Sequence, residues 1–154
     1  MAELLNEKRD FINWVLSLME LDDQLWFQSF SEGKWATADV ISHFITWDNF
    51  FLEHRIPYIQ QNIPFPQMDI NTEAMNRDAS KYARSGISKQ EVIKEFIEAR
   101  SKVIQWLEEL PEDAYMRMLH IGKNEIELIS YFQSHHHHDI THKKQIVDFL
   151  KTQV

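Results

Sequence analysis

Residues 88–111 read SKQEVIKEFIEARSKVIQWLEELP, and this segment decides the fold class. Ser88 followed three residues later by Glu91 forms a capping box, in which two side chains satisfy free backbone amides at a helix start, and Ile87 with Val92 fits the accompanying hydrophobic staple. Pro111 stops the pattern because proline cannot continue a helix. The segment therefore predicts one long amphipathic helix, whose apolar residues recur every three or four positions at Val92, Ile93, Phe96, Ile97, Val103, Ile104, Trp106 and Leu107.

The same spacing of apolar residues continues in both directions along the chain. It predicts long helices over residues 3–19, 37–61 and 124–152 and a short helix over residues 72–82. Pro64 and Pro66 predict an extended loop over residues 62–70, and Gly33 predicts a turn in the connector over residues 20–35. At roughly 100–200 residues per domain, we expect residues 1–154 to form a single all-α domain, a four-helix bundle with one longer crossover.

Composition excludes several classes of function. Lys and Arg number 16 and Asp and Glu 24, so the net charge is −8, which repels phosphate backbones and predicts no nucleic-acid partner. With no Cys in the chain, thiolate zinc sites and cysteine nucleophiles are excluded. The three Gly residues stand too far apart for a phosphate-binding loop. No apolar stretch reaches the ~18 residues of a membrane span and no signal peptide is visible, so we expect a cytoplasmic protein with no membrane partner.

Five of the eight histidines fall in one segment, residues 134–142, which reads SHHHHDITH. An expression tag is disfavoured, because an amphipathic helical pattern continues through residues 143–150. On a helix, His138 and His142 lie one turn apart, close enough for both imidazoles to reach one cation, although such a pair also occurs as a packed hydrogen-bonded pair. His135 lies on the same inward stripe. Its role is left open between a hydrogen-bond donor to the ligands, an alternative ligand and a residue that lines the pocket. His136 and His137 point elsewhere and are predicted to be solvated.

His43 is the candidate third ligand, because it shares the apolar stripe of the helix predicted over residues 37–61. An unpaired imidazole is an unusual core residue, and the alternative is a core histidine satisfied by hydrogen bonds. His54 lies eleven residues further on, about 16 Å along a helix, and is interpreted as a surface or structural residue. His120 has no spacing argument behind it.

Two acidic residues neighbour these histidines. Asp39 lies one turn before His43 and either orients its free ring nitrogen or, as we favour, complements the helix dipole. Asp139 adjoins His138 but points about 100° away around the helix, so we expect it to be solvated or paired with Lys143.

The segments WATADVISHFITWD, residues 35–48, and HDITHKKQI, residues 138–146, resemble the DinB-like (YfiT-like) superfamily of metalloenzymes over nearly the whole chain. The resemblance implies a four-helix bundle, commonly a homodimer, in which His43, His138 and His142 bind one divalent metal. It also makes Gln145 the candidate residue that hydrogen-bonds to a ligating histidine and orients it. Where relatives have Ser or Thr as the helix cap, this chain has Ala36, so we expect Thr37 to serve as the cap.

Three imidazoles leave a zinc or nickel ion with open positions for a water or a thiolate. Some relatives are S-transferases that use bacillithiol, mycothiol or glutathione, so the resemblance implies a thiol S-transferase acting on a small molecule, with a metal-dependent hydrolase as the alternative. Because the chain has no Cys, the thiol would be a cosubstrate. The competing hypothesis is a non-catalytic binding or dimerisation module, with an aromatic surface formed by Trp26, Phe27, Phe50 and Phe51.

Overall fold

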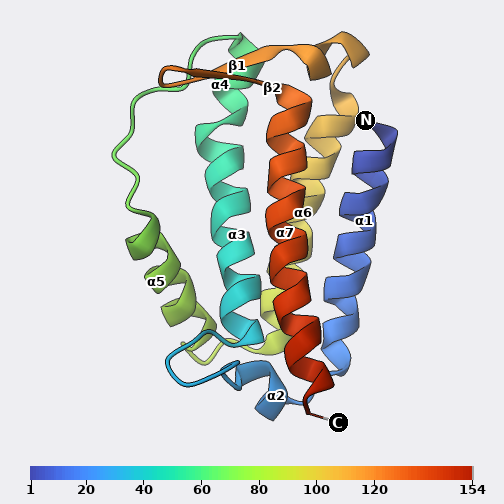
Figure 1. Cartoon of the computed structure of the whole chain (residues 1–154), viewed down its shortest axis with the longest axis vertical. Coiled ribbons are helices and arrows are strands. Elements are labelled where there is room, and N and C mark those ends of the chain that lie inside the picture. The colour runs from blue at the N-terminus through green and yellow to red at the C-terminus, as the bar shows by residue number, and fades with distance from the viewer. Residues whose placement is uncertain (154) are drawn as a thin grey trace.

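Four long helices lie side by side in the computed structural model, which describes residues 1–153 (Figure 1). They are α1 (Ala2–Ser17), α3 (Thr37–His54), α6 (Lys89–Glu109) and α7 (Leu128–Lys151). This confirms the predicted all-α four-helix bundle. Val154, the last residue of the predicted domain, lies outside the described residues.

Shorter elements connect the four helices. They are η1 (Leu18–Glu20), α2 (Asp23–Phe27), α4 (Ile56–Gln61), α5 (Thr72–Ala83), η2 (Glu112–Met116), β1 (Met118–Ile121) and β2 (Asn124–Glu127). From α4 the chain returns along the outside of the bundle through α5 before α6 begins, so α3 and α6 run in the same direction (Figure 1). This is the predicted longer crossover.

One half of the capping box predicted for α6 is found among the described residues. The hydroxyl of Ser88 accepts a hydrogen bond from the amide of Glu91 at 3.1 Å, and the helix ends before Leu110, which is extended. Most of the predicted apolar stripe is buried, so α6 packs as a central helix.

Two details of the helix predicted over residues 37–61 are wrong. It breaks at Arg55, between α3 and α4, because Pro57 removes a helical amide and its ring clashes with the carbonyl four residues back. Its cap is not Thr37, whose hydroxyl is buried without a hydrogen-bond partner among the described residues. Instead the carboxylate of Asp39 accepts a hydrogen bond from the amide of Ala36 at 2.7 Å, which satisfies one of the free amides of the helix start.

The last helix begins later than predicted. Residues 124–127 form strand β2, which pairs antiparallel with β1, and α7 starts only at Leu128. The two-residue turn has a positive φ of 62° at Gly122 and none at Lys123, the conformation of a type II′ hairpin turn. A Gly-X pair between two short segments was the sequence signal for this hairpin.

Two of the four aromatic residues predicted to form a dimer surface are in the core. Trp26 is 0% exposed and Phe51 is 2% exposed, and Phe27 and Phe50 are partly buried. The predicted aromatic dimer surface is therefore wrong as far as Trp26 and Phe51 are concerned. Within residues 1–153, no helix combines the length and the apolar character needed to cross a membrane.

Candidate metal centre

Helix α3 places His43 in the interior of the bundle, where its side chain is 2% exposed. Its Nδ1 lies 2.7 Å from the carbonyl oxygen of Val40. Because a carbonyl only accepts hydrogen bonds, Nδ1 carries the proton and Nε2 keeps its lone pair. Burial lowers the pKa of His43 to about 3, so the imidazole is neutral near pH 7, the form in which histidine binds metals.

Helix α7 presents His138 and His142 to His43. The Nε2 atoms of His138 and His142 lie 3.2 Å apart, and Nδ1 of His142 donates to the side-chain oxygen of Gln145 at 2.9 Å. That bond leaves Nε2 of His142 unprotonated and able to bind a metal ion, as the bond to the Val40 carbonyl does for His43. Gln145, the residue predicted to support a ligand, is the partner of His142 in this bond.

The three predicted ligands meet. One ligand atom from each of His43, His138 and His142 lies within 4.8 Å of the other two. Nitrogens that share one tetrahedral zinc ion at bond lengths of about 2.0–2.1 Å are about 3.3 Å apart, close to the 3.2 Å between His138 and His142. Residues 95 positions apart in sequence, His43 and His138, therefore form a set that suits a divalent ion.

The three histidines form part of the wall of a cavity of about 390 Å³ between α3, α5 and α7, which we call the chamber. Its other walls combine the aromatic residues Trp35, Phe44 and Trp47 with polar and charged side chains. Trp35 lies nearly parallel to His142, with an interplanar angle of 23° and ring centroids 6.2 Å apart. On the α5 side, Trp47 donates to the side-chain oxygen of Asn76 at 3.0 Å, which leaves the amide nitrogen of Asn76 for a ligand. The chamber is of the size and character of a small-molecule site.

A family model described as the DinB superfamily matches residues 10–146. The chain belongs to the DinB superfamily. The resemblance seen in the sequence is thereby confirmed for the family. The three histidines that it implied as ligands lie close together in the structure. The sequence matches none of the curated proteins with which it was compared.

Solved structures share the fold of this DinB-superfamily chain. YfiT from Bacillus subtilis, described as a probable metal-dependent hydrolase with an unusual four-helix bundle topology, is 13% identical with a TM-score of 0.70, over 98% of this chain and 84% of YfiT. A mycothiol-dependent maleylpyruvate isomerase is 15% identical with a TM-score of 0.70, over 94% of this chain. This chain covers only 60% of that isomerase.

A third solved structure is the colibactin self-resistance protein ClbS in complex with a dsDNA. It is 16% identical to this DinB-superfamily chain with a TM-score of 0.65, over 99% of this chain and 92% of ClbS. At these identities the three structures establish the shared fold.

The wall of the chamber includes a buried ionic cluster that joins three helices of this DinB-superfamily fold. Arg100 of α6 donates to Asp48 of α3 and to Asp139 of α7, each at 2.8 Å for the shortest bond. All three residues are buried and line the chamber. Burial alone would raise the pKa of Asp139, but the positive charges of Arg100 and Lys8 outweigh it and hold that pKa below its usual range. Arg100 thus ties together the two helices that carry the histidines.

The prediction for Asp139 is therefore wrong. It is neither solvated nor paired with Lys143, whose ammonium lies over the ring of Trp14 instead. The signal was available, because Asp48 lies four residues after Phe44 and Arg100 four residues after Phe96, on the apolar stripes of their helices. Charged residues on buried stripes call for partners of opposite charge.

Asp39 does not orient His43. Besides the amide of Ala36, its carboxylate accepts from Ser80 at 2.5 Å and from Arg84 at 2.6 Å, both at the α5 end of the crossover. It therefore fastens the start of α3 to α5, which forms one wall of the chamber. The favoured interpretation, a residue that serves the helix start, agrees with this geometry.

The remaining histidines lie outside the convergent set. His135 lines the chamber and packs on Tyr131 with ring centroids 4.7 Å apart. His136 is not solvated as predicted, since its side chain is 14% exposed and lies 3.6 Å from Glu7, whereas His137 is exposed. His54 packs on Phe50 at the end of α3, and His120 lies 3.2 Å from Glu125 in the hairpin.

Acidification is expected to destabilise the metal-free protein. Burial lowers the pKa of His43 to about 3 and that of His135 to about 4, whereas both titrate near ~6.5 in the unfolded chain. Between these values the unfolded state binds more protons, so the free energy of unfolding falls with falling pH, by about 1.4 kcal/mol per pH unit for each histidine. Urea unfolding midpoints in EDTA at pH 7.5, 6 and 5 measure this slope. His135→Phe should make the slope shallower, and an unchanged slope in that variant would contradict the assignment.

Gln145→Ala is expected to weaken metal binding about tenfold, because it removes the hydrogen-bond partner of a ligating histidine, and such partners typically contribute 10–100-fold. The lower end of that range is expected because the contact between Gln145 and His142 is exposed. Gln145→Glu keeps an acceptor oxygen and should retain most of the affinity. Competition with a chromophoric chelator measures both. Equal affinity of the alanine variant and the parent would show that the bond does not support the ligand.

Proposed function

We propose that this chain is a divalent-metal-dependent enzyme that acts on a small molecule, with zinc or nickel held by Nε2 of His43, His138 and His142. The observation that supports it is the convergence of three imidazoles on the wall of a chamber of about 390 Å³. Three protein ligands are the number found in catalytic zinc sites, whereas structural sites have four.

Within that class we propose the transfer of a thiol sulfur to an electrophile. The bound ion would supply Lewis acidity that lowers the pKa of the nucleophile. The thiolate sulfur forms a bond to an electrophilic carbon, and the leaving group departs with the bonding electrons. With no Cys in the chain, the thiol is a second small molecule, and the name of the mycothiol-dependent isomerase supports this choice.

The chain's own residues would bind and orient the electrophile. Trp35, Phe44 and Trp47 offer aromatic faces to an apolar or aromatic substrate, and the free amide nitrogen of Asn76 can donate to its polar group. The alternative is hydrolysis, in which water takes the place of the thiol, and the description of YfiT supports that alternative.

A turnover assay separates the two reactions. EDTA-treated protein is supplied with zinc or nickel and tested with bacillithiol, mycothiol or glutathione against a chloronitroarene, and with p-nitrophenyl esters without thiol. S-transfer predicts a thioether and chloride, formed only with both metal and thiol, whereas hydrolysis predicts ester cleavage without thiol. No metal-dependent product in either arm would overturn the enzymatic proposal in favour of the binding module.

We further propose a cytoplasmic homodimer with no nucleic-acid partner. The net charge of −8 opposes binding to phosphate backbones, although the fold also occurs in ClbS, solved with a dsDNA. Sedimentation of the protein alone and with a duplex DNA at low salt tests first the homodimer and second the absence of a nucleic-acid partner. A monomer would refute the first, and a salt-sensitive DNA complex would refute the second.

A further inference from the structure

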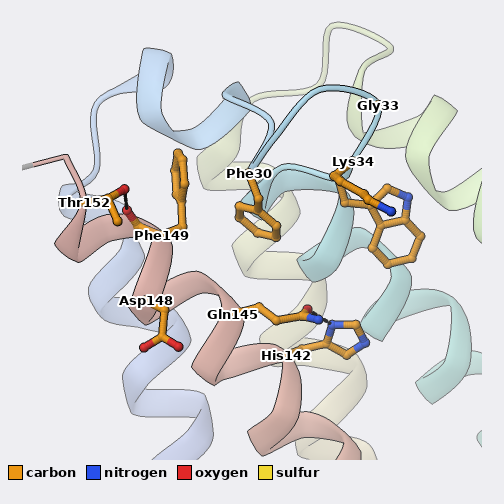
Figure 2. Close-up of a pocket in the computed structure, with 9 residues that line it drawn as sticks. Phe30, Gly33, Lys34, His142, Gln145, Asp148, Phe149 and Thr152 are labelled. Carbon is orange, nitrogen blue, oxygen red and sulfur yellow. Dashed lines mark hydrogen bonds between the residues drawn. The ribbon is translucent and has the colours of Figure 1, made fainter.

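A second cavity, which we call the recess, lies beside His142 and has a volume of about 760 Å³ (Figure 2). The loop that carries Phe30, Gly33 and Lys34 forms one wall, and residues of the C-terminal half of α7 form the other. Trp35 and His142 belong to the walls of both recess and chamber, whereas His43 and His138 line only the chamber. The recess therefore adjoins the proposed metal centre.

The loop wall is held in one conformation by its backbone. The amide of Phe30 donates to the carbonyl of Trp35 at 2.8 Å, and the amide of Lys34 donates to the carbonyl of Ser31 at 3.0 Å. Gly33, at the third position of this turn, has a φ of +73°, which favours glycine. Phe30 and Lys34 therefore project from a closed turn rather than from a free loop.

The recess has one uncompensated charge. The carboxylate of Asp148 accepts from Lys144 at 2.5 Å, and this hydrogen bond lowers its pKa. Within residues 1–153 the ammonium of Lys34 makes no ion pair or hydrogen bond. A recess in a chain of net charge −8 thus offers a positive group to a ligand.

A second donor and an apolar surface accompany that charge. The side-chain oxygen of Gln145 is used by His142, so its Nε2 hydrogens are left to donate, and within residues 1–153 they have no acceptor. The ring centroids of Phe30 and Phe149 lie 5.2 Å apart, and both rings line the same recess as these donors. Figure 2 shows Lys34 on the loop side and Gln145 on the α7 side of the same recess.

We propose that the recess binds a small organic carboxylate. The ammonium of Lys34 pairs with the carboxylate, Nε2 of Gln145 donates to it, and the apolar body of the ligand packs on Phe30 and Phe149. Charge-assisted hydrogen bonds of this kind are stronger than neutral ones. The site goes beyond the proposed function, since binding in the recess requires no metal.

The test uses EDTA-treated protein and two matched probes, 3-phenylpropionate and its neutral amide, 3-phenylpropionamide. Nitrogen-15 NMR titrations are expected to show shifts in residues 30–35 and 145–152 and in the side-chain amide of Gln145. Lys34→Gln is expected to weaken binding of the acid about fivefold or more and to leave the weaker binding of the amide unchanged. Lys34→Arg keeps the charge and should bind the acid, and Lys102→Gln, which removes an exposed lysine of α6, is the matched control.

Two results would overturn the proposal. One is equal affinity for the acid and the amide, which would leave only apolar contact. The other is an affinity for the acid that Lys34→Gln does not change. Because the titration is done without metal, either failure is distinguishable from a failure of the metal-dependent reaction, which is measured in the loaded protein.

Discussion

His43→Ala is expected to reduce bound zinc or nickel from about one ion per chain to near zero after dialysis, with affinity at least a hundredfold lower. His43 supplies one of three ligand atoms that lie within 4.8 Å of one another, and its Nδ1 bond to Val40 holds the ring in the ligating tautomer. Removing it leaves two imidazoles on one helix turn, a pair that seldom binds a metal tightly. Elemental analysis of untagged protein gives the stoichiometry, and chelator competition gives the affinity.

Matched variants keep this prediction from resting on a folding defect. His137→Ala removes an exposed histidine of the same run and should bind as much metal as the parent. His142→Ala removes a half-buried ligand with less effect on the core and should lose metal as His43→Ala does, while its circular dichroism stays that of the parent. Full metal content in both ligand variants would defeat the three-histidine centre.

Much of this site could be predicted from the sequence because it is built on helical periodicity. His138 and His142 are one turn apart, so their convergence follows from the geometry of a helix alone. His43 could be placed only on the inward stripe of its own helix. That it faces α7 rather than another helix depended on the resemblance of residues 35–48 to a known family, since periodicity does not choose between neighbours in a bundle.

The errors have local causes that helical periodicity does not register. Pro57 ends α3 in the middle of an apolar pattern, and the Gly122-Lys123 turn forms a hairpin whose strands have only four residues each. Strands that short carry too few residues for an alternating pattern to be visible. Asp39, rather than the predicted Thr37, caps the start of α3, because a carboxylate three residues into the helix can also reach the first free amides.

The ionic cluster was missed for a different reason. Asp48, Arg100 and Asp139 come from three helices, and each one by itself resembles a tolerable exception on an apolar stripe. Their partnership appears only when the helices are placed together. Residues of this kind matter most to stability, because a buried charge that loses its partner is far more costly than an exposed one.

Arg100→Met is accordingly expected to destabilise the protein by about 3–5 kcal/mol, the range for breaking a buried ion pair by removing one partner. The variant leaves the carboxylates of Asp48 and Asp139 in the core with no arginine to accept from. It also removes the cation that lies 5.0 Å from the centre of the Phe96 ring. Urea unfolding followed by circular dichroism at pH 7.5 in EDTA measures the loss.

A variant in which the cluster carries no charge separates the electrostatic contribution of Arg100 to stability from its packing contribution. A triple variant, Arg100→Met with Asp48→Asn and Asp139→Asn, removes all three charges at nearly constant volume and should recover part of the lost stability, because a buried amide without a partner costs less than a buried uncompensated charge. Arg9→Ala removes an exposed arginine paired with Glu108 and should cost no more than about 1 kcal/mol. If the triple variant were as unstable as Arg100→Met, the loss would lie in packing around the arginine stem rather than in two uncompensated carboxylates. Recovery would instead show that the charges in the chamber wall are not needed for folding.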